Sequence, residues 1–168
     1  MSELASSPFN TAASANAGDE RSEEHAVSAH SGQLDWLLDE FVGATPGVVH
    51  GVVVSGDGLR LATSKRVSTA LGDQLAAAAS ALVSLACGTA HLLSAEPVKQ
   101  TILEMVGGYL FVSSVSHGPV LASVSHGPVL AVFAKRQCDI GLVGYEITML
   151  ASRVGHALTP APRAVEGR

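Results

Sequence analysis

The segment from Leu75 to Leu93, LAAAASALVSLACGTAHLL, runs for nineteen residues without a formal charge. A helix with so little charge must be shielded from water on more than one side. A lipid bilayer, the core of one domain and a contact between two subunits could each provide that cover. About 20 apolar residues cross a bilayer, but alanine, serine, glycine and histidine contribute little favourable transfer energy there. We therefore expect no direct membrane insertion, and the other two environments stay open.

The composition favours a protein that binds other proteins. Charged residues make up 15% of the 168 residues and apolar residues 47%, which is little charge for a monomer that must cover itself with solvated side chains. Residues 1–32 hold five acids and one base, and so they account for most of the formal charge of −5. The nearly neutral remainder makes nucleic acid an unexpected partner.

Targeting and cysteine signals are weak. No basic start followed by an apolar stretch opens the chain, and Cys87 and Cys138 show no CxxC or metal-binding spacing. We expect a cytoplasmic protein with reduced thiols. Its partners could recruit it to the membrane.

Hydrophobic periodicity predicts one domain over residues 32–158, between a disordered acidic tail (1–31) and a flexible tail (159–168). A short helix capped by Ser31 should open it. Strands over 48–54 and 59–64 should follow, because the turn Ser55-Gly-Asp-Gly58 is a strong hairpin signal. The apolar residues of the first helix recur at i, i+3, i+4 and i+7: Leu34, Leu37, Leu38 and Phe41.

The central helix has two contrasting faces on a helical wheel. One is predicted to pack on the sheet and consists of Leu75, Leu82, Leu85, Thr89, Leu92 and Leu93. Small residues on the opposite face would let another helix backbone approach closely: Ala77, Ala81, Ser84 and Gly88. We interpret this face as a helix-helix contact between subunits. A helix buried within its own domain and an alanine-rich surface are the alternatives.

Three further strands, 100–106, 109–115 and 129–135, precede a last helix that Asp139 should cap. Their apolar residues are consecutive rather than alternating, which indicates helices on both faces of the sheet. The apolar residues of the last helix keep a three-and-four spacing: Ile140, Val143, Ile147, Leu150, Val154 and Leu158.

Four segments resemble the roadblock/dynein light-chain family: VVHGVVVSGDGLRLATS, SALVSLACGTAHLL, VKQTILEMVGGYLFVSSVSHGP and CDIGLVGYEITMLASRVG. The resemblance covers about residues 33–158 and is strongest to the actinobacterial branch, which is encoded beside a sensor-kinase-like protein and a small Ras-like GTPase. It implies an α+β, three-layer α/β/α roadblock-like (profilin-like) fold. The five-stranded antiparallel sheet would follow the order α-β-β-α-β-β-β-α.

The resemblance also implies a homodimer in which the strand within Gln100–Val106 pairs with its symmetry mate and the central helices pack together. In this chain the strand would contribute Thr101, Leu103 and Met105. Family members regulate or scaffold small GTPases and have no catalytic centre. The expected partners are therefore a second copy, a small Ras-like GTPase and a sensor-kinase-like protein, without a cofactor or metal.

Sequence motifs agree with a non-enzymatic role. The chain has no GxxxxGK[ST] phosphate loop, GxSxG elbow or HExxH motif. Arg60, Lys65 and Arg66 could contact an acidic partner surface or supply an arginine finger. Solvated charges at the end of a strand are the simpler interpretation. The competing function is a small-molecule sensor with an internal pocket, although bulky strand residues should fill the core.

A tandem repeat departs from the family pattern, because SVSHGPVLA occurs at 114–122 and again at 123–131. An insertion of nine residues within one strand would exchange its core and solvent faces and place a proline in the ladder. We therefore expect the fourth strand to end near Val115, residues Ser116–Pro128 to form an enlarged connection, and Val129–Ala134 to supply the fifth strand.

Overall fold

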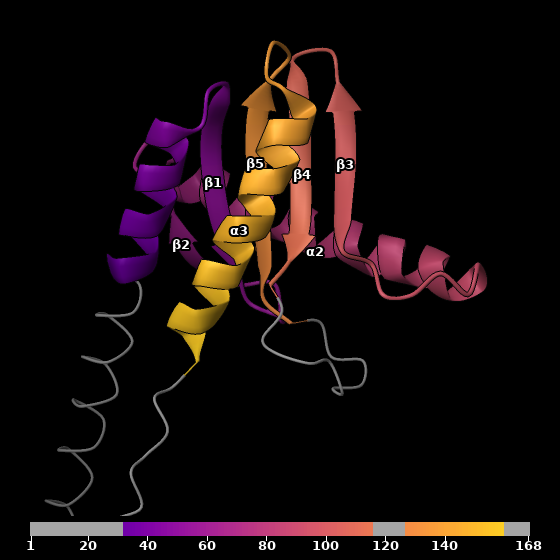
Figure 1. Ribbon diagram of the computed structural model, residues 1–168. Coiled ribbons are helices and arrows are strands. Elements are labelled where there is room, and N and C mark those ends of the chain that lie inside the picture. Colours follow the sequence, from indigo (N-terminus) through magenta and orange to yellow (C-terminus); the bar gives the residue numbers. More distant parts are fainter. Residues whose placement is uncertain (1–31, 116–126, 160–168) are drawn as a thin grey trace, which may run out of the picture.

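The computed structural model describes residues 32–115 and 127–159. The chain begins with a first helix over residues 32–44. After it come β1 (Val48–Val54), β2 (Arg60–Thr63), α2 (Thr69–Leu92), β3 (Gln100–Met105), β4 (Gly108–Ser114), β5 (Val129–Lys135) and α3 (Ile140–Leu158) (Figure 1). This confirms the predicted order of helices and strands.

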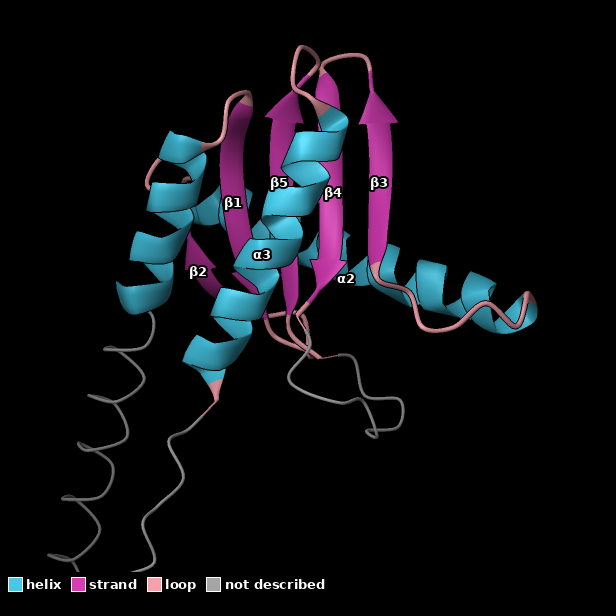
Figure 2. Ribbon diagram, viewed as in Figure 1, coloured by secondary structure: helices cyan, strands magenta, loops and turns pink. Residues whose placement is uncertain are grey.

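The strands form one antiparallel sheet in the order β2-β1-β5-β4-β3. The first helix and α3 cover one face of the sheet, and α2 crosses the other (Figure 2). Separate apolar cores lie on the two faces. The structure therefore confirms the three-layer α+β fold and explains the consecutive apolar residues of the strands, since both faces are covered.

The two helices on the first face bury most of the residues that periodicity selected, although Ile140 at the start of α3 is 40% exposed and Leu158 at its end is half-buried. Leu34, Leu37, Leu38 and Phe41 of the first helix are buried, as are Val143, Ile147, Leu150 and Val154 of α3. Asp139 caps α3 as predicted, since its Oδ1 accepts a hydrogen bond from the Leu142 N–H at 3.0 Å. Arg153 and Glu40 join the two helices through an ion pair of 2.9 Å.

The predicted sheet-facing side of α2 is wrong. The buried residues of α2 are Gly72, Ala76, Ala79, Val83 and Ala90. Leu75 and Leu82 pack only at the border of this core, whereas Leu85, Leu92 and Leu93 are 71%, 84% and 71% exposed. The small side chains let the helix backbone lie close to the sheet, and the leucines are displaced to its flank.

The strands on either side of the tandem repeat end and begin close to where they were predicted to. The fourth strand ends at Ser114 and the fifth begins at Val129, and the Val115 N–H donates to the Pro128 carbonyl oxygen at 2.8 Å. Most of the predicted connection, residues 116–126, lies outside the described residues. The predicted Ser31 cap, the acidic tail (1–31) and residues 160–168 lie outside them as well.

Candidate protein interface

The two edges of the sheet differ chemically. At the β2 edge, the first helix supplies two carboxylates to the outward-facing backbone. Asp35 Oδ1 accepts the Thr63 N–H at 2.8 Å, and Asp39 Oδ1 accepts the Lys65 N–H at 2.7 Å. A free strand edge is a template for pairing with another chain. These carboxylates close the β2 edge to such pairing.

The β3 edge is open. Within the described residues β3 pairs with β4 alone, from Gln100 opposite Ser113 to Met105 opposite Gly108. Ile102 is 47% exposed and Leu103 40% exposed. An edge strand that carries apolar side chains and unpaired backbone groups is an aggregation hazard unless another strand covers it.

The predicted interface residues of β3 share one face. Leu103 lies opposite Leu110, and Thr101 lies opposite Val112. Leu110 and Val112 belong to the core beneath α2, and residues directly opposite on paired strands point to the same face. Thr101, Leu103 and Met105 therefore lie on the α2 side of the sheet.

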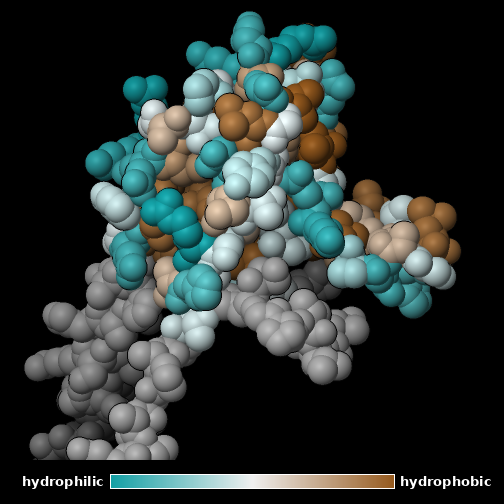
Figure 3. Space-filling model, viewed as in Figure 1, coloured by the Kyte–Doolittle hydropathy of each residue, from teal (hydrophilic) through white to brown (hydrophobic). Residues whose placement is uncertain are grey.

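The C-terminal part of α2 projects past β3 (Figure 1). Apolar residues gather on this projection and along the neighbouring edge of the sheet (Figure 3). The projection carries Leu85, Leu92 and Leu93, and β3 adds Leu103 and Met105. We call these five residues the leucine patch. Covering one leucine contributes roughly 1.5–3 kcal/mol, so a partner on this patch would gain substantial stabilisation.

The predicted small-residue stripe borders two of the exposed leucines, because Ala81 precedes Leu85 by four residues and Gly88 precedes Leu92 by four. Ala77, Ala81, Ser84 and Gly88 are all exposed. A Cβ added at Gly88 would meet no atom within 4 Å. The stripe is thus accessible and adjoins the α2 part of the leucine patch.

The three candidate basic residues have different surroundings. Arg60 Nε pairs with Asp73 Oδ1 at 2.7 Å, and Lys65 Nζ lies 3.5 Å from Asp39 Oδ2. Arg66 is exposed and forms no ion pair with the described part of the chain. Arg66 is therefore the one of the three whose charge is not already matched by a carboxylate.

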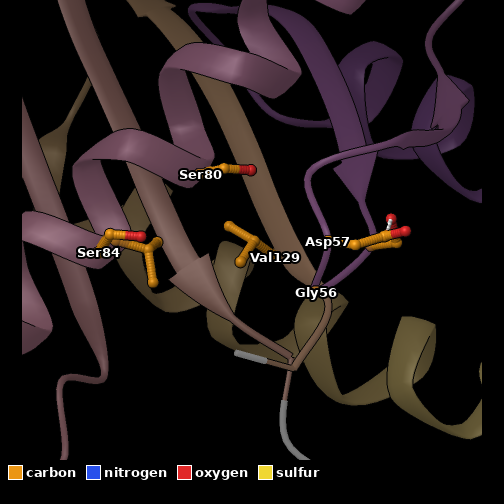
Figure 4. Close-up of a pocket in the computed structure, with 7 residues that line it drawn as sticks. Gly56, Asp57, Ser80, Ser84 and Val129 are labelled. Atoms are coloured by element: carbon orange, nitrogen blue, oxygen red, sulfur yellow. Dashed lines mark hydrogen bonds between the residues drawn. The ribbon is translucent and has the colours of Figure 1, made fainter. Parts of the chain in front are cut away.

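A small cavity of about 180 Å³ lies between the β1–β2 turn and α2. Figure 4 shows Ser80 and Ser84 of α2 on one side, Gly56 and Asp57 of the turn on the other, and Val129 between them. Its volume is below the roughly 300 Å³ of small ligand sites. The Ser55 hydroxyl donates to the Asp57 carboxylate and thereby lowers the pKa of Asp57. The turn that forms one wall of the cavity is thus held by its own hydrogen bond.

The described residues contain no group of three or more His, Cys, Asp or Glu side chains placed to hold a metal ion. Both cysteines are free thiols. Burial raises the pKa of the Cys138 thiol, and the neighbouring Asp139 carboxylate adds to this rise.

Sequence reasoning missed two parts of this interface. The sequence patterns assigned no role to Asp35 and Asp39, although their spacing of four places both carboxylates on one side of a helix. The exposed leucines were assigned to the core. Their displacement depends on the angle at which α2 crosses the sheet, which a helical wheel does not contain.

Comparisons with known proteins agree with this architecture. A family model described as the Roadblock/LC7 domain matches residues 34–125. A Roadblock/LC7 domain from Streptomyces avermitilis is 32% identical, with a TM-score of 0.62, covering 71% of this chain and 92% of that one. No curated protein matches the sequence.

Two more distant structures share the fold. Myxococcus xanthus MglB is 15% identical, with a TM-score of 0.61, covering 74% of this chain and 93% of that one. The gliding protein MglB from Thermus thermophilus is 14% identical, with a TM-score of 0.63, covering 77% and 90%.

Proposed function

Because this chain belongs to the Roadblock/LC7 family, we propose that it is a non-enzymatic, dimeric regulator or scaffold of a small Ras-like GTPase in bacterial signalling. It acts in the cytoplasm, and its partners recruit it to the membrane. A sensor-kinase-like protein is the further partner that the family resemblance suggests.

The observation that best supports a dimer is the contrast between the closed β2 edge and the open β3 edge. Two β3 strands paired antiparallel about a two-fold axis would satisfy the free backbone groups of both chains. They would also join two sheets into one. The overhanging end of each α2 would then extend over the partner's sheet, because α2 already projects beyond β3 (Figure 1).

The same arrangement supports a role for the leucine patch. Leu85 and Leu92 of one chain would cover Leu103 and Met105 of the other, and the two α2 helices would pack side by side. The sequence-based proposal assigns the helix contact to Ala77, Ala81, Ser84 and Gly88 instead. We retain both assignments as testable alternatives, and the exposed leucines favour the leucine patch.

A membrane is the other environment that such a helix fits. Among the described residues, Thr69–Leu92 is long and apolar enough to span a bilayer by length and composition. Its N-terminal half, however, packs on the sheet through Ala76, Ala79 and Val83, and Asp73 forms an ion pair with Arg60. These contacts support a protein partner for the exposed half.

The function is tested by binding purified small Ras-like GTPases, chosen from the genomic neighbours of the gene, in their GDP and GTP states. We expect the chain to bind at least one of them with a preference for one nucleotide state. Leu103→Arg should weaken binding if the dimer forms the binding surface, whereas Lys99→Ala, an exposed change at the start of β3, should not. No binding in either state would contradict the proposal.

The purified protein used for GTPase binding also tests the competing function, a small-molecule sensor. Val52, Val54, Leu110 and Val112 fill the core beneath α2, so we expect no ligand to co-purify. A co-purifying small molecule identified by native mass spectrometry, together with no GTPase binding, would favour the sensor.

A further inference from the structure

The α2 face of the sheet carries a row of side chains that continues from the open edge to β1. Strand pairing aligns Leu103, Leu110, Phe133 and His50 across four strands. At the far end of this row, His50 and Phe133 are half-buried, and their rings stack with centroids 6.3 Å apart. An aromatic pair therefore lies partly open to solvent, well away from the β3 edge.

Two basic side chains flank this pair. Arg66 follows β2, and its charge lowers the pKa of His50, although burial is the larger cause of that shift. Ser64, two residues before Arg66, exchanges hydrogen bonds with Gly51, the residue after His50, and this brings Arg66 close to the imidazole. Lys135 comes two residues after Phe133 on β5, so it points to the same face. Both bases are exposed, and neither forms an ion pair within the described residues.

We call His50, Arg66, Phe133 and Lys135 the His50 surface. No carboxylate in the described part of β1, β5, β4 or β3 points to this face. Glu104 lies on the opposite face, because it pairs with Tyr109, which packs in the other core. The nearest acid on α2, Asp73, is paired with Arg60. The surface is therefore basic and aromatic without internal neutralisation.

We propose that the His50 surface binds an acidic segment of a partner protein. Carboxylates of that segment would contact Arg66 and Lys135, since a guanidinium can hold a carboxylate through two hydrogen bonds. An apolar side chain beside them would cover Phe133 and His50. The chemistry favours a peptide over nucleic acid, because two bases are few for phosphate binding. The proposal is independent of the GTPase and of the dimer.

The test uses the full chain and a fluorescein-labelled peptide, Glu-Glu-Phe-Asp-Leu-Glu-Glu, followed by fluorescence anisotropy at low and moderate salt. We expect saturable binding that weakens with salt. Arg66→Glu and Lys135→Glu should each reduce affinity by about tenfold, because charge reversal places like charges together. Lys99→Glu is the matched control: it reverses another exposed base, just before β3 at the opposite edge of the sheet, and should leave affinity unchanged.

Any of the following results would overturn the proposal. The first is the absence of peptide binding, and an equal loss of affinity in the Lys99→Glu control would do so too. The second is tighter binding of a single-stranded DNA oligomer of the same net charge, which would assign the surface to nucleic acid. The third is a gain in affinity when Glu23 and Glu24 of the full chain are changed to lysine, since the chain's own acidic residues would then be the occupant.

Discussion

At the scale of single residues, His50 shows how the fold changes a side chain's chemistry. Its ring stacks on Phe133, and its Nδ1 atom is buried without a hydrogen-bond partner among the described residues. Burial, followed by the charge of Arg66, lowers its pKa below 6.5. The sequence pattern predicts only that His50 lies in a strand. The effect depends on β5 and on the loop before α2, which only the fold brings to it.

The first prediction concerns this pKa. In an NMR titration of the wild type, the His50 ring should titrate below 6.5. Arg66→Ala should raise the pKa of His50 only part of the way, because burial remains. A His50→Gln variant identifies the resonance. If the pKa of His50 were unchanged in Arg66→Ala, the charge of Arg66 would not be a cause of the shift.

The same shift sets a direction for stability. The unfolded chain binds a proton at His50 at a higher pH than the folded chain does. As pH falls through about 6.5 toward the lower folded pKa, this group therefore destabilises the fold. Urea midpoints should decline less over that range in His50→Gln than in the wild type.

Two glycines provide the second prediction. Gly108 has φ +155°, and an added Cβ would collide with the Ala134 carbonyl oxygen. Gly108→Ala should therefore destabilise the protein by about 2 kcal/mol or more. Gly88 lies in α2 with open space around it, so Gly88→Ala should stabilise the helix by about 0.5–1 kcal/mol. Urea denaturation of the two variants measures both changes in stability. An equal loss of stability in both would contradict the contrast between the crowded Gly108 and the open Gly88.

At the scale of elements, hydrophobic periodicity correctly predicted the buried side of a helix where that helix has a single apolar stripe. The first helix and α3 each meet one sheet face, and their apolar stripes are buried as expected, apart from Ile140 and Leu158 at the two ends of α3. In α2 the apolar residues extend around most of the helix, so periodicity could not decide which side meets the sheet. The structure places alanines there and leaves leucines exposed. Packing distance, which favours small residues, decided this orientation.

The repeat between β4 and β5 gives the third prediction. Twelve residues separate Val115 from Pro128, and these two residues are already hydrogen-bonded. Deleting one nine-residue copy leaves Ser-His-Gly as a three-residue hairpin loop, a length for which glycine at the last position is typical.

We expect the shortened protein to fold with stability within about 1 kcal/mol of the wild type, since loop closure depends weakly on length. Circular dichroism and thermal unfolding test this. A lost or broadened transition would show that the second copy contributes to the fold.

At the scale of the whole molecule, most of the architecture could be predicted from the sequence. The hairpin turn, the strands and the last cap follow local rules, and the family resemblance supplied the layer order. The contrast between the two sheet edges could not be predicted, because it depends on Asp35 and Asp39 reaching a strand more than twenty residues away. That contrast now makes β3 the expected place for a second copy.

The fourth prediction separates the two candidate faces of α2. Leu85→Arg should dissociate the dimer if the leucine patch forms the interface, whereas Ser84→Arg, about 100° around the helix from Leu85, should do so if the small-residue stripe forms it. Sedimentation velocity of the two variants distinguishes the alternatives. Retention of the dimer in both would show that α2 is not required for the contact.

The most direct test of the account is the mass in solution of the wild type and of Leu103→Arg, measured by light scattering after gel filtration. We predict twice the 17.1 kDa of one chain for the wild type and a single-chain mass for Leu103→Arg, with native circular dichroism in both. A single-chain mass for the wild type, or an unchanged dimer in the variant, would contradict pairing through the open β3 edge.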